Sequence, residues 1–289
     1  MNQIVYLNGE FMPLAEAKIP VLDRGFIFGD GVYEVIPVYS RSAFRLAEHL
    51  RRLQASLNSV RIDNPHSEDR WTEIVNTIIA RNETDDQYLY LHITRGVAKR
   101  DHAFPNPPVA PTVFVMSYPL ITPPSSLLHS GVSAITATDN RWLRCDIKAI
   151  SLLPNVLLRQ AAVDAGCAET IMLRDDEFMT EGAASNIFVV KNGTLLAPPK
   201  NNLMLPGITY DVVLELAEKN NIPYQIRSIN KTELLDADEL LLTSSTKEVL
   251  PITLLDGRQV GSGQPGPMFR KLYQQYQIFK RDVMRKSTE

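Results

Sequence analysis

The sequence has 289 residues, of which 44% are hydrophobic and 22% charged, and its formal net charge is −3. A chain of this length can bury a substantial core in one large or two modest domains, and the small net charge gives no reason to expect a nucleic acid or an anionic membrane as a partner. No apolar run approaches membrane-spanning length and the start lacks the regions of a signal peptide, which predicts a cytoplasmic protein. The two cysteines, Cys145 and Cys167, make neither a disulfide framework nor a metal site.

The first half of the chain is predicted to alternate strands with helices. Residues 3–13 alternate around Asn8-Gly9, which is typical of a hairpin with a primed turn. Three glycines within residues 23–31 fit neither a P-loop nor a dinucleotide fingerprint, so turns are expected there. In chain order, the other patterns predict a strand over 32–39, amphipathic helices over 47–59 and 70–82, and strands over 88–95 and 109–118.

Residues 120–126, Leu-Ile-Thr-Pro-Pro-Ser-Ser, form the most linker-like segment of the chain, and we expect the domain boundary there. The second half is again mixed in its patterns. It is predicted to contain strands over 132–137, 170–174, 186–191 and 239–243, helices over 155–165 and 208–220, and a terminal helix near 267–285.

Lys148 lies between a short stretch and the start of an apolar helix that Pro154 opens and Gly166 ends. A lysine in this position has little freedom to reach solvent, so its amine can be held in a dry, preorganised place. An amine held in this way can attack a carbonyl. The segment therefore predicts a nucleophilic lysine.

Three segments carry a resemblance to a known family. Residues 141–148 (Arg-Trp-Leu-Arg-Cys-Asp-Ile-Lys), 180–186 (Thr-Glu-Gly-Ala-Ala-Ser-Asn) and 205–209 (Leu-Pro-Gly-Ile-Thr) resemble, in order, those of the class IV, or fold-type IV, pyridoxal-phosphate aminotransferases. Within the family, the D-amino-acid (D-alanine) aminotransferases are the most similar. The resemblance implies an α+β fold with a small N-terminal α/β sandwich-like domain (1–119), a linker (120–126) and a larger C-terminal pseudo-barrel domain that binds the cofactor (127–289).

The resemblance also implies a set of residues that bind pyridoxal 5′-phosphate. Lys148 would bond to the cofactor aldehyde and move the substrate's α-proton. Glu181 would face the pyridine nitrogen, where a carboxylate favours the protonated ring, and Arg141 would bind the ring hydroxyl. The guanidinium of Arg52 would bind the phosphate. The helix start at Ile208 and Thr209 and the hydroxyl of Ser245 would bind it as well.

A further group would bind the substrate carboxylate. Tyr33 matches a substrate-facing tyrosine of the family. Arg100 and His102 resemble the carboxylate trap of the D-amino-acid aminotransferases, which reaches into the neighbouring subunit's site. An arginine binds a carboxylate with two hydrogen bonds and a histidine adds a donor. The resemblance thus implies a homodimer that selects D-amino acids.

The function implied is transfer of the amino group of D-alanine, D-glutamate or D-aspartate to a 2-oxo acid, by a ping-pong mechanism and without a metal. Other enzymes with the same scaffold are alternatives: an L-branched-chain aminotransferase, an (R)-amine transaminase or an aminodeoxychorismate lyase. A cofactor-binding protein without turnover is a third possibility, against which the presence of both Lys148 and Glu181 argues.

Overall fold

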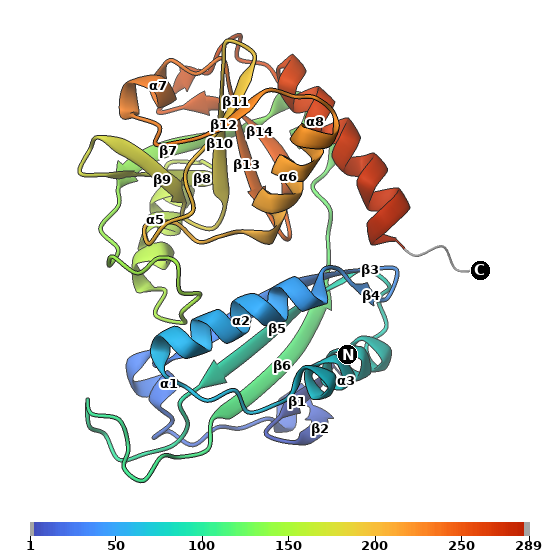
Figure 1. The fold of residues 1–289 in the computed structure, drawn as a ribbon, viewed down its shortest axis with the longest axis vertical. Coiled ribbons are helices and arrows are strands. Elements are labelled where there is room, and N and C mark those ends of the chain that lie inside the picture. Colours follow the sequence, from blue (N-terminus) through green and yellow to red (C-terminus); the bar gives the residue numbers. More distant parts are fainter. Residues whose placement is uncertain (1–2, 286–289) are drawn as a thin grey trace. The chain divides into compact units, whose positions relative to one another are not determined.

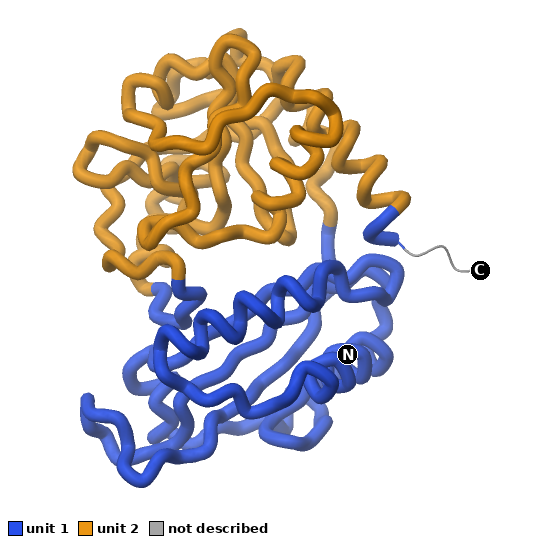
Figure 2. The backbone as a smooth tube through the Cα atoms, in the orientation of Figure 1, with its two compact units in different colours: residues 1–121, 147–152, 283–289 blue, residues 122–146, 153–282 orange. Residues whose placement is uncertain are grey.

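The computed structural model describes residues 3–285, which form two compact units (Figure 2). Unit 1 comprises Met1–Ile121, Ile147–Leu152 and Val283–Glu289, and unit 2 comprises Thr122–Asp146 and Leu153–Asp282. The first division thus falls inside the segment 120–126. The segment 147–152, which contains Lys148, belongs to unit 1 and not to the C-terminal part of the chain where we had expected it.

Unit 1 is built on one antiparallel sheet (Figure 1). Its strands are β1 (Ile4–Leu7), β2 (Glu10–Pro13), β3 (Gly31–Tyr39), β4 (Ser42–Ala43), β5 (Gln87–Thr94) and β6 (Thr112–Pro119). They lie in the order β2-β1-β6-β5-β3-β4. Asn8 and Gly9 have positive φ angles of 49° and 109°, which confirms the predicted primed turn between β1 and β2. β6 starts later than predicted, directly after Pro111, which lacks the N–H that a strand donates.

Helices α2 (Leu46–Val60) and α3 (Glu68–Arg81) cover one face of this sheet (Figure 1). The buried leucines of α2, the predicted amphipathic helix, pack with Trp71 and Ile74 of α3 against Ile36 and Leu91 of the strands. Because side chains alternate across a strand, Tyr33 of β3 points to the opposite face of the sheet. The two helices therefore make the core on one face and leave an aromatic face on the other.

A short helix, α1 (Arg24–Phe28), occupies the glycine-containing stretch where turns alone were predicted. Asp23 begins it, because its side chain accepts a hydrogen bond of 2.8 Å from the backbone N–H of Gly25. Gly29 ends it with a left-handed φ of 66°, a conformation that glycine adopts without strain. The prediction was wrong here because a five-residue helix is too short to show a periodic pattern.

Unit 2 is built on a larger, curled sheet. Its strands are β7 (Val132–Thr138), β8 (Glu169–Arg174), β9 (Phe178–Gly182), β10 (Asn186–Lys191), β11 (Thr194–Ala197), β12 (Tyr224–Ile226), β13 (Glu239–Ser244), β14 (Glu248–Leu255) and β15 (Arg258–Gln259). The main order is β12-β11-β10-β13-β14-β7-β8-β9, with β15 paired to β14. The last strand in this order, β9, also contacts β10, so the sheet curls into an incomplete barrel. The protein thus has the α+β, two-domain fold that was predicted.

The helices of unit 2 are α4 (Ser125–Ser130), α5 (Leu153–Asp164), α6 (Ile208–Lys219), α7 (Lys231–Leu235) and α8 (Pro267–Phe279). The predicted terminal helix is therefore shorter than expected, and a π-helical turn over Lys280–Met284 follows it. Among the helices of residues 3–285, none has both the length and the apolar character needed to cross a membrane.

Candidate active site

Lys148 lies on a short segment that extends the edge of the unit 1 sheet. The backbone N–H of Tyr33 donates to the carbonyl of Lys148 over 2.9 Å, and Ala149 forms an isolated antiparallel bridge with Val32. Ile147 and Ala149 belong to the core cluster, and alternation places the Lys148 side chain on the other face, with Tyr33. Its Nζ lies 4.1 Å from the centroid of the Tyr33 ring. The segment also contacts α2, because the backbone N–H of Lys148 donates to Ser56 Oγ over 3.3 Å, so the lysine lies beside both Tyr33 and the helix that carries Arg52.

The Lys148 side chain is buried, with 9% of its residue surface exposed. Among the hydrogen bonds and ion pairs of the described residues, none involves its Nζ; the contact with the Tyr33 ring is a cation–π interaction. The amine of Lys148 is buried, lies against the Tyr33 ring and pairs with no carboxylate of residues 3–285. It is therefore available to react with a carbonyl group.

Arg52 of α2 is paired with Glu34 of β3, which faces the helices. Arg52 Nε donates to Glu34 Oε1 and its Nη2 to Oε2, each over 2.7 Å, in a bidentate ion pair. His49, one turn earlier on α2, forms a 2.8 Å hydrogen bond between Nδ1 and Glu34 Oε2. Glu34 thus holds Arg52 and His49 in fixed orientations.

The electrostatics of this cluster follow from its burial. Burial acts to raise the pKa of Glu34, but the charge and hydrogen bonds of Arg52, with the His49 hydrogen bond, outweigh it, so this pKa lies well below its ordinary value. Burial lowers the pKa of His49, which the hydrogen bond to Glu34 opposes without overcoming. His49 is therefore neutral at pH 7. Its Nε2 is buried and has no hydrogen-bond partner among the described residues.

Arg100 and His102 lie on the exposed loop between β5 and β6. Both contact the ring of Phe28 at the end of α1: the centroid lies 5.4 Å from Arg100 Cζ and 5.3 Å from the centre of the His102 ring. The structure therefore brings these two predicted residues together at one place on unit 1.

In unit 2, Arg141 is buried between two carboxylates. Its Nε and Nη2 donate to Asp139 over 2.9 and 2.8 Å, and its Nη1 donates to Glu181 Oε1 over 2.6 Å. Thr180 also donates to Asp139, and Arg174 forms an ion pair with it at 3.3 Å. Arg141 and Glu181, which were predicted from separate motifs, are thus direct partners.

Glu181 has an unusual titration for a glutamate. Burial raises its pKa from 4.5 to about 7, although the charge and hydrogen bond of Arg141 and a hydrogen bond from the backbone N–H of Leu205 act in the opposite direction. Asn186 donates to Glu181 Oε2 over 3.3 Å and to the Leu205 carbonyl over 3.0 Å. A carboxylate that is costly to ionise in its pocket would be stabilised by a cationic ligand group beside it.

The predicted phosphate-binding residues of unit 2 lie near one end of its sheet. Gly207 is the N-cap of α6, and a Cβ at this position would come within 2.0 Å of Asn186 Oδ1, so any larger residue would displace the Asn186 side chain. Ile208 and Thr209 form the first turn of α6 and are buried. Asn186 pairs in register with Thr243, and Ser245 lies in the turn just after that strand. A helix start and a strand-end hydroxyl near each other suit an anion.

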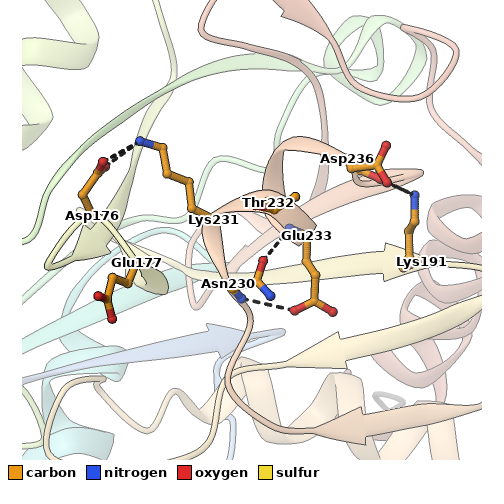
Figure 3. A pocket seen from close by; sticks show the side chains of 8 residues that line it. All are labelled: Asp176, Glu177, Lys191, Asn230, Lys231, Thr232, Glu233 and Asp236. Atoms are coloured by element: carbon orange, nitrogen blue, oxygen red, sulfur yellow. Dashed lines mark hydrogen bonds and ion pairs between the residues drawn. The ribbon is translucent and has the colours of Figure 1, made fainter.

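A surface pocket of about 460 Å³ also lies in unit 2, but it contains none of the predicted site residues (Figure 3). Lys231 pairs there with Asp176, Lys191 pairs with Asp236, and Asn230 and Glu233 form a reciprocal capping box. Both lysines of the pocket are thus paired with aspartates at the surface. We therefore assign no catalytic role to this pocket.

Three residues with evident roles in these clusters were missed from the sequence: Glu34, Asp139 and Asn186. Glu34 directly follows Tyr33, and Asp139 precedes Arg141 by two positions, so proximity in the chain was an available signal. Asn186 ends the motif that begins at Thr180. Their roles depend on partners that only folding brings close.

The chain is similar to known proteins over most of its length. Residues 31–255 match the family model for amino-transferase class IV. The chain is 42% identical over 268 residues to a D-alanine aminotransferase of Bacillus licheniformis, in an alignment that covers 93% of this chain and 94% of the relative. It is 39% identical over 277 residues to a D-alanine aminotransferase of Staphylococcus aureus strain MSSA476, with 95% and 97% of the two chains covered.

Solved structures show the same fold. A branched-chain amino acid aminotransferase of Escherichia coli superposes with a TM-score of 0.90 and 27% identity, over 100% of this chain and 97% of that one. A branched-chain amino acid aminotransferase from T.th., solved with pyridoxamine 5′-phosphate, also gives a TM-score of 0.90, with 26% identity over 99% and 96% of the two chains.

The side chains described above fit the groups of pyridoxal 5′-phosphate one by one. The buried amine of Lys148 suits its aldehyde, the buried carboxylate of Glu181 suits a protonated ring nitrogen, and the start of α6 suits its phosphate. The protein belongs to the class IV aminotransferases, because it matches them over most of the chain. It is therefore a pyridoxal-phosphate-dependent enzyme, in agreement with this chemistry.

Proposed function

We propose that the enzyme is a D-amino-acid transaminase that moves the amino group of D-alanine, D-glutamate or D-aspartate to a 2-oxo acid. The observation that carries this proposal is the similarity to D-alanine aminotransferases, at 42% and 39% identity over nearly the full length of both chains. The loop with Arg100 and His102 supports it, because these residues offer donors for a substrate carboxylate. We further propose a cytoplasmic location, as the sequence suggested.

The proposed roles follow the chemistry of each side chain. Lys148 is the residue to which the cofactor is attached, Glu181 pairs with its ring nitrogen, and Arg141 binds its ring hydroxyl. Arg52 supplies a guanidinium for the phosphate, while Glu34 keeps its orientation fixed. The other phosphate contacts are those of Ile208, Thr209 and Ser245.

Bound pyridoxal phosphate supplies an electron sink that stabilises negative charge at the substrate's α-carbon. The side chains of the protein then direct the proton. Lys148 Nζ accepts the proton from the α-carbon and later delivers it to a different carbon atom. Tyr33 packs against this amine at 4.1 Å and limits its movement. Arg100 and His102 hold the carboxylate, which decides which face of the substrate presents its α-hydrogen to Lys148 and thereby selects the D-form.

We also propose that the working unit is a homodimer. Unit 1 exposes large apolar side chains on two adjacent segments: Val21, Leu22, Phe26, Val97 and Phe104. These segments are joined by hydrogen bonds from Arg24 N–H to the Gly96 carbonyl and from Ala98 N–H to the Leu22 carbonyl. An apolar surface of this kind is typical of a protein interface. The carboxylate-binding loop belongs to the same surface, which supports its action in a second copy of the chain.

A half-reaction tests the substrate class. The purified enzyme with its cofactor is mixed with one amino donor and no 2-oxo acid, and the absorbance of the bound cofactor is followed. D-Alanine and D-glutamate should convert it within seconds, and L-alanine should not. In Lys148→Ala, conversion should be lost, because the amine that moves the proton is gone. Borohydride reduction and peptide mapping should place the cofactor on Lys148 alone.

The alternatives give different results in this experiment. Rapid conversion by L-leucine would indicate a branched-chain aminotransferase, and conversion by (R)-1-phenylethylamine in preference to D-alanine would indicate an (R)-amine transaminase. Catalytic formation of pyruvate without any 2-oxo acid acceptor would indicate a lyase. Any of these outcomes contradicts the proposed D-amino-acid specificity.

A further inference from the structure

Arg24, at the start of α1, joins this helix to the loop that carries Arg100 and His102. Its guanidinium is buried, with 4% of the residue exposed. Nη1 donates to the carbonyls of Asp101 and Ala103 over 2.6 and 3.2 Å, and Nη2 donates to the carbonyl of His102 over 3.4 Å. One side chain thus binds three consecutive carbonyls, which fixes the path of the loop on both sides of His102.

Arg24 is itself held in place by Asp30. Its Nε donates to Asp30 Oδ2 over 2.8 Å. Asp30 also accepts two hydrogen bonds from Arg95, over 2.8 and 2.9 Å, and Arg95 donates in turn to the carbonyls of Val60 and Arg61. The loop is therefore connected through two arginines and one carboxylate to the C-terminal end of α2.

Phe28, at the other end of α1, contacts the side chains of the loop. Its ring centroid lies 4.9 Å from Cζ of Arg24 and 5.4 Å from Cζ of Arg100. The His102 ring lies 5.3 Å away, tilted by 36°. An aromatic face attracts a guanidinium even at an exposed site. Phe28 thus gives both predicted carboxylate-binding side chains a common support.

This support matters because the loop lacks burial of its own. Residues 100–104 are all exposed, and the apolar contact that they make with the rest of unit 1 includes the ring of Phe104, whose centroid lies 3.7 Å from Cζ of Arg95. An exposed loop that becomes ordered only on binding costs conformational entropy for each backbone residue that is fixed. A loop that is fixed beforehand avoids this cost and binds more tightly.

We propose that Arg24 and Phe28 are positioning residues that hold Arg100 and His102 in the orientation needed to bind the substrate carboxylate. This inference rests on the proposed function, in which Arg100 and His102 bind that carboxylate. Arg24 and Phe28 act through the loop and touch neither substrate nor cofactor in this role. They should therefore affect the binding of amino acids more than the chemical step.

The test is the steady-state kinetics of Arg24→Lys with D-alanine. Lysine keeps a positive charge beside Asp30, but its compact ammonium group cannot span three carbonyls as the planar guanidinium does. We expect KM for D-alanine to rise about tenfold and kcat to change by less than about threefold, since binding is weakened while the proton-transfer groups are intact. Trypsin should also cleave the folded variant after Lys99 or Arg100 faster than it cleaves the wild type.

Arg41→Lys is the matched control. Arg41 lies in the same unit and also binds several carbonyls, but at the C-terminal end of α3, including those of Ile79 and Ala80 over 2.8 and 3.1 Å. It should leave KM for D-alanine and the cleavage at Lys99 unchanged. If both variants raise KM equally, the effect is a general loss of stability and the inference is wrong.

A double mutant separates positioning from other effects. If Arg24 acts through Arg100, then Arg24→Lys should raise KM much less in an Arg100→Ala background, because interacting residues are not additive. Fully additive effects would contradict the inference.

Phe28→Leu provides a second variant that keeps an apolar side chain, and it should raise KM in the same way. If Arg24→Lys fails to fold, an unchanged KM in Phe28→Leu is sufficient to reject the proposal.

Failure of this inference differs from failure of the proposed function. If the wild type does not convert D-alanine, the function itself is wrong. If the wild type converts D-alanine and Arg100→Ala raises KM, but Arg24→Lys and Phe28→Leu do not, only the positioning role is wrong.

Discussion

Two buried glutamates, each paired with an arginine, differ in how much positive charge that arginine brings to them, and their pKa values shift in opposite directions. Glu34 receives two hydrogen bonds from Arg52 and one from His49, and its pKa is lowered although burial acts to raise it. Glu181 receives only one from Arg141, whose other donors bind Asp139, and burial raises its pKa to about 7. Because Arg141 is shared between two carboxylates, its positive charge does not offset the effect of burial on Glu181.

The raised pKa of Glu181 predicts the pH dependence of the apoprotein's stability. A carboxyl whose pKa is about 7 when folded and 4.5 when unfolded binds more protons in the folded state. Its contribution to the free energy of unfolding therefore falls as pH rises from about 4.5 to 7. Glu181→Gln removes this titration, so the variant should lose less stability between about pH 5 and pH 8 than the wild type, by roughly 1–3 kcal/mol.

Urea unfolding of both apoproteins at several pH values measures this difference. At about pH 4.5 the wild-type carboxyl is largely protonated in the folded state, so the two proteins should have similar stabilities there, which serves as the internal control. Parallel curves between about pH 5 and pH 8 would show that Glu181 does not titrate as described.

At the scale of elements, α5 shows that an apolar stripe on a helix does not always face its own core. Leu158 and Ala162 are buried, but Leu153, Val156 and Leu157 of the same helix are 69%, 59% and 60% exposed. The helical pattern was thus predicted correctly, but three of its apolar side chains face outward. The proposed homodimer gives this surface a natural partner.

A charge on this stripe should weaken the dimer. Burying one leucine at an interface contributes about 1.5–3 kcal/mol, and a two-fold axis makes each substitution count twice, so Leu157→Asp should raise the dimer dissociation constant about 100-fold or more. Sedimentation velocity at decreasing concentration measures it. Leu235→Asp, at a leucine of α7 that is 49% exposed, is the matched control and should leave the dimer intact. An unchanged dissociation constant for Leu157→Asp would place α5 outside the interface.

At the scale of the whole molecule, the proposed sharing of sites between two chains can be tested by complementation. Lys148→Ala and Arg100→Ala protomers are unfolded together and refolded as a mixture. If Arg100 serves the neighbouring subunit's site, each mixed dimer has one site with an intact Lys148 and an intact Arg100. Random pairing then restores about a quarter of the wild-type activity with D-alanine.

The two variants refolded separately are the controls, and their summed activity gives the baseline. If Arg100 served the site of its own chain, every site in a mixed dimer would lack one of the two residues. The mixture would then show no more activity than that baseline, and the proposal that the loop acts in a second copy would be wrong.

Much of the fold follows from patterns that are local in the sequence. The Asn8-Gly9 hairpin, the leucine stripe of α2 and the start of α6 at Ile208 were all predicted, because turn chemistry and side-chain periodicity act over a few neighbouring residues. The residue types of the site were equally visible, since Lys148 and Glu181 lie in short contiguous motifs. The sequence by itself therefore determined these elements, the family and the chemical groups that are present.

The tertiary structure decided how those groups are paired. Arg141 meets Glu181 across 40 positions of the chain, and Arg24 reaches the carbonyl of Asp101 across 77. It also placed Lys148 in unit 1, against Tyr33, although the neighbouring segments on both sides belong to unit 2. Such pairings depend on which distant segments pack together, and no local periodicity encodes them, because the free energy that selects them comes from burial and hydrogen bonding in the complete fold.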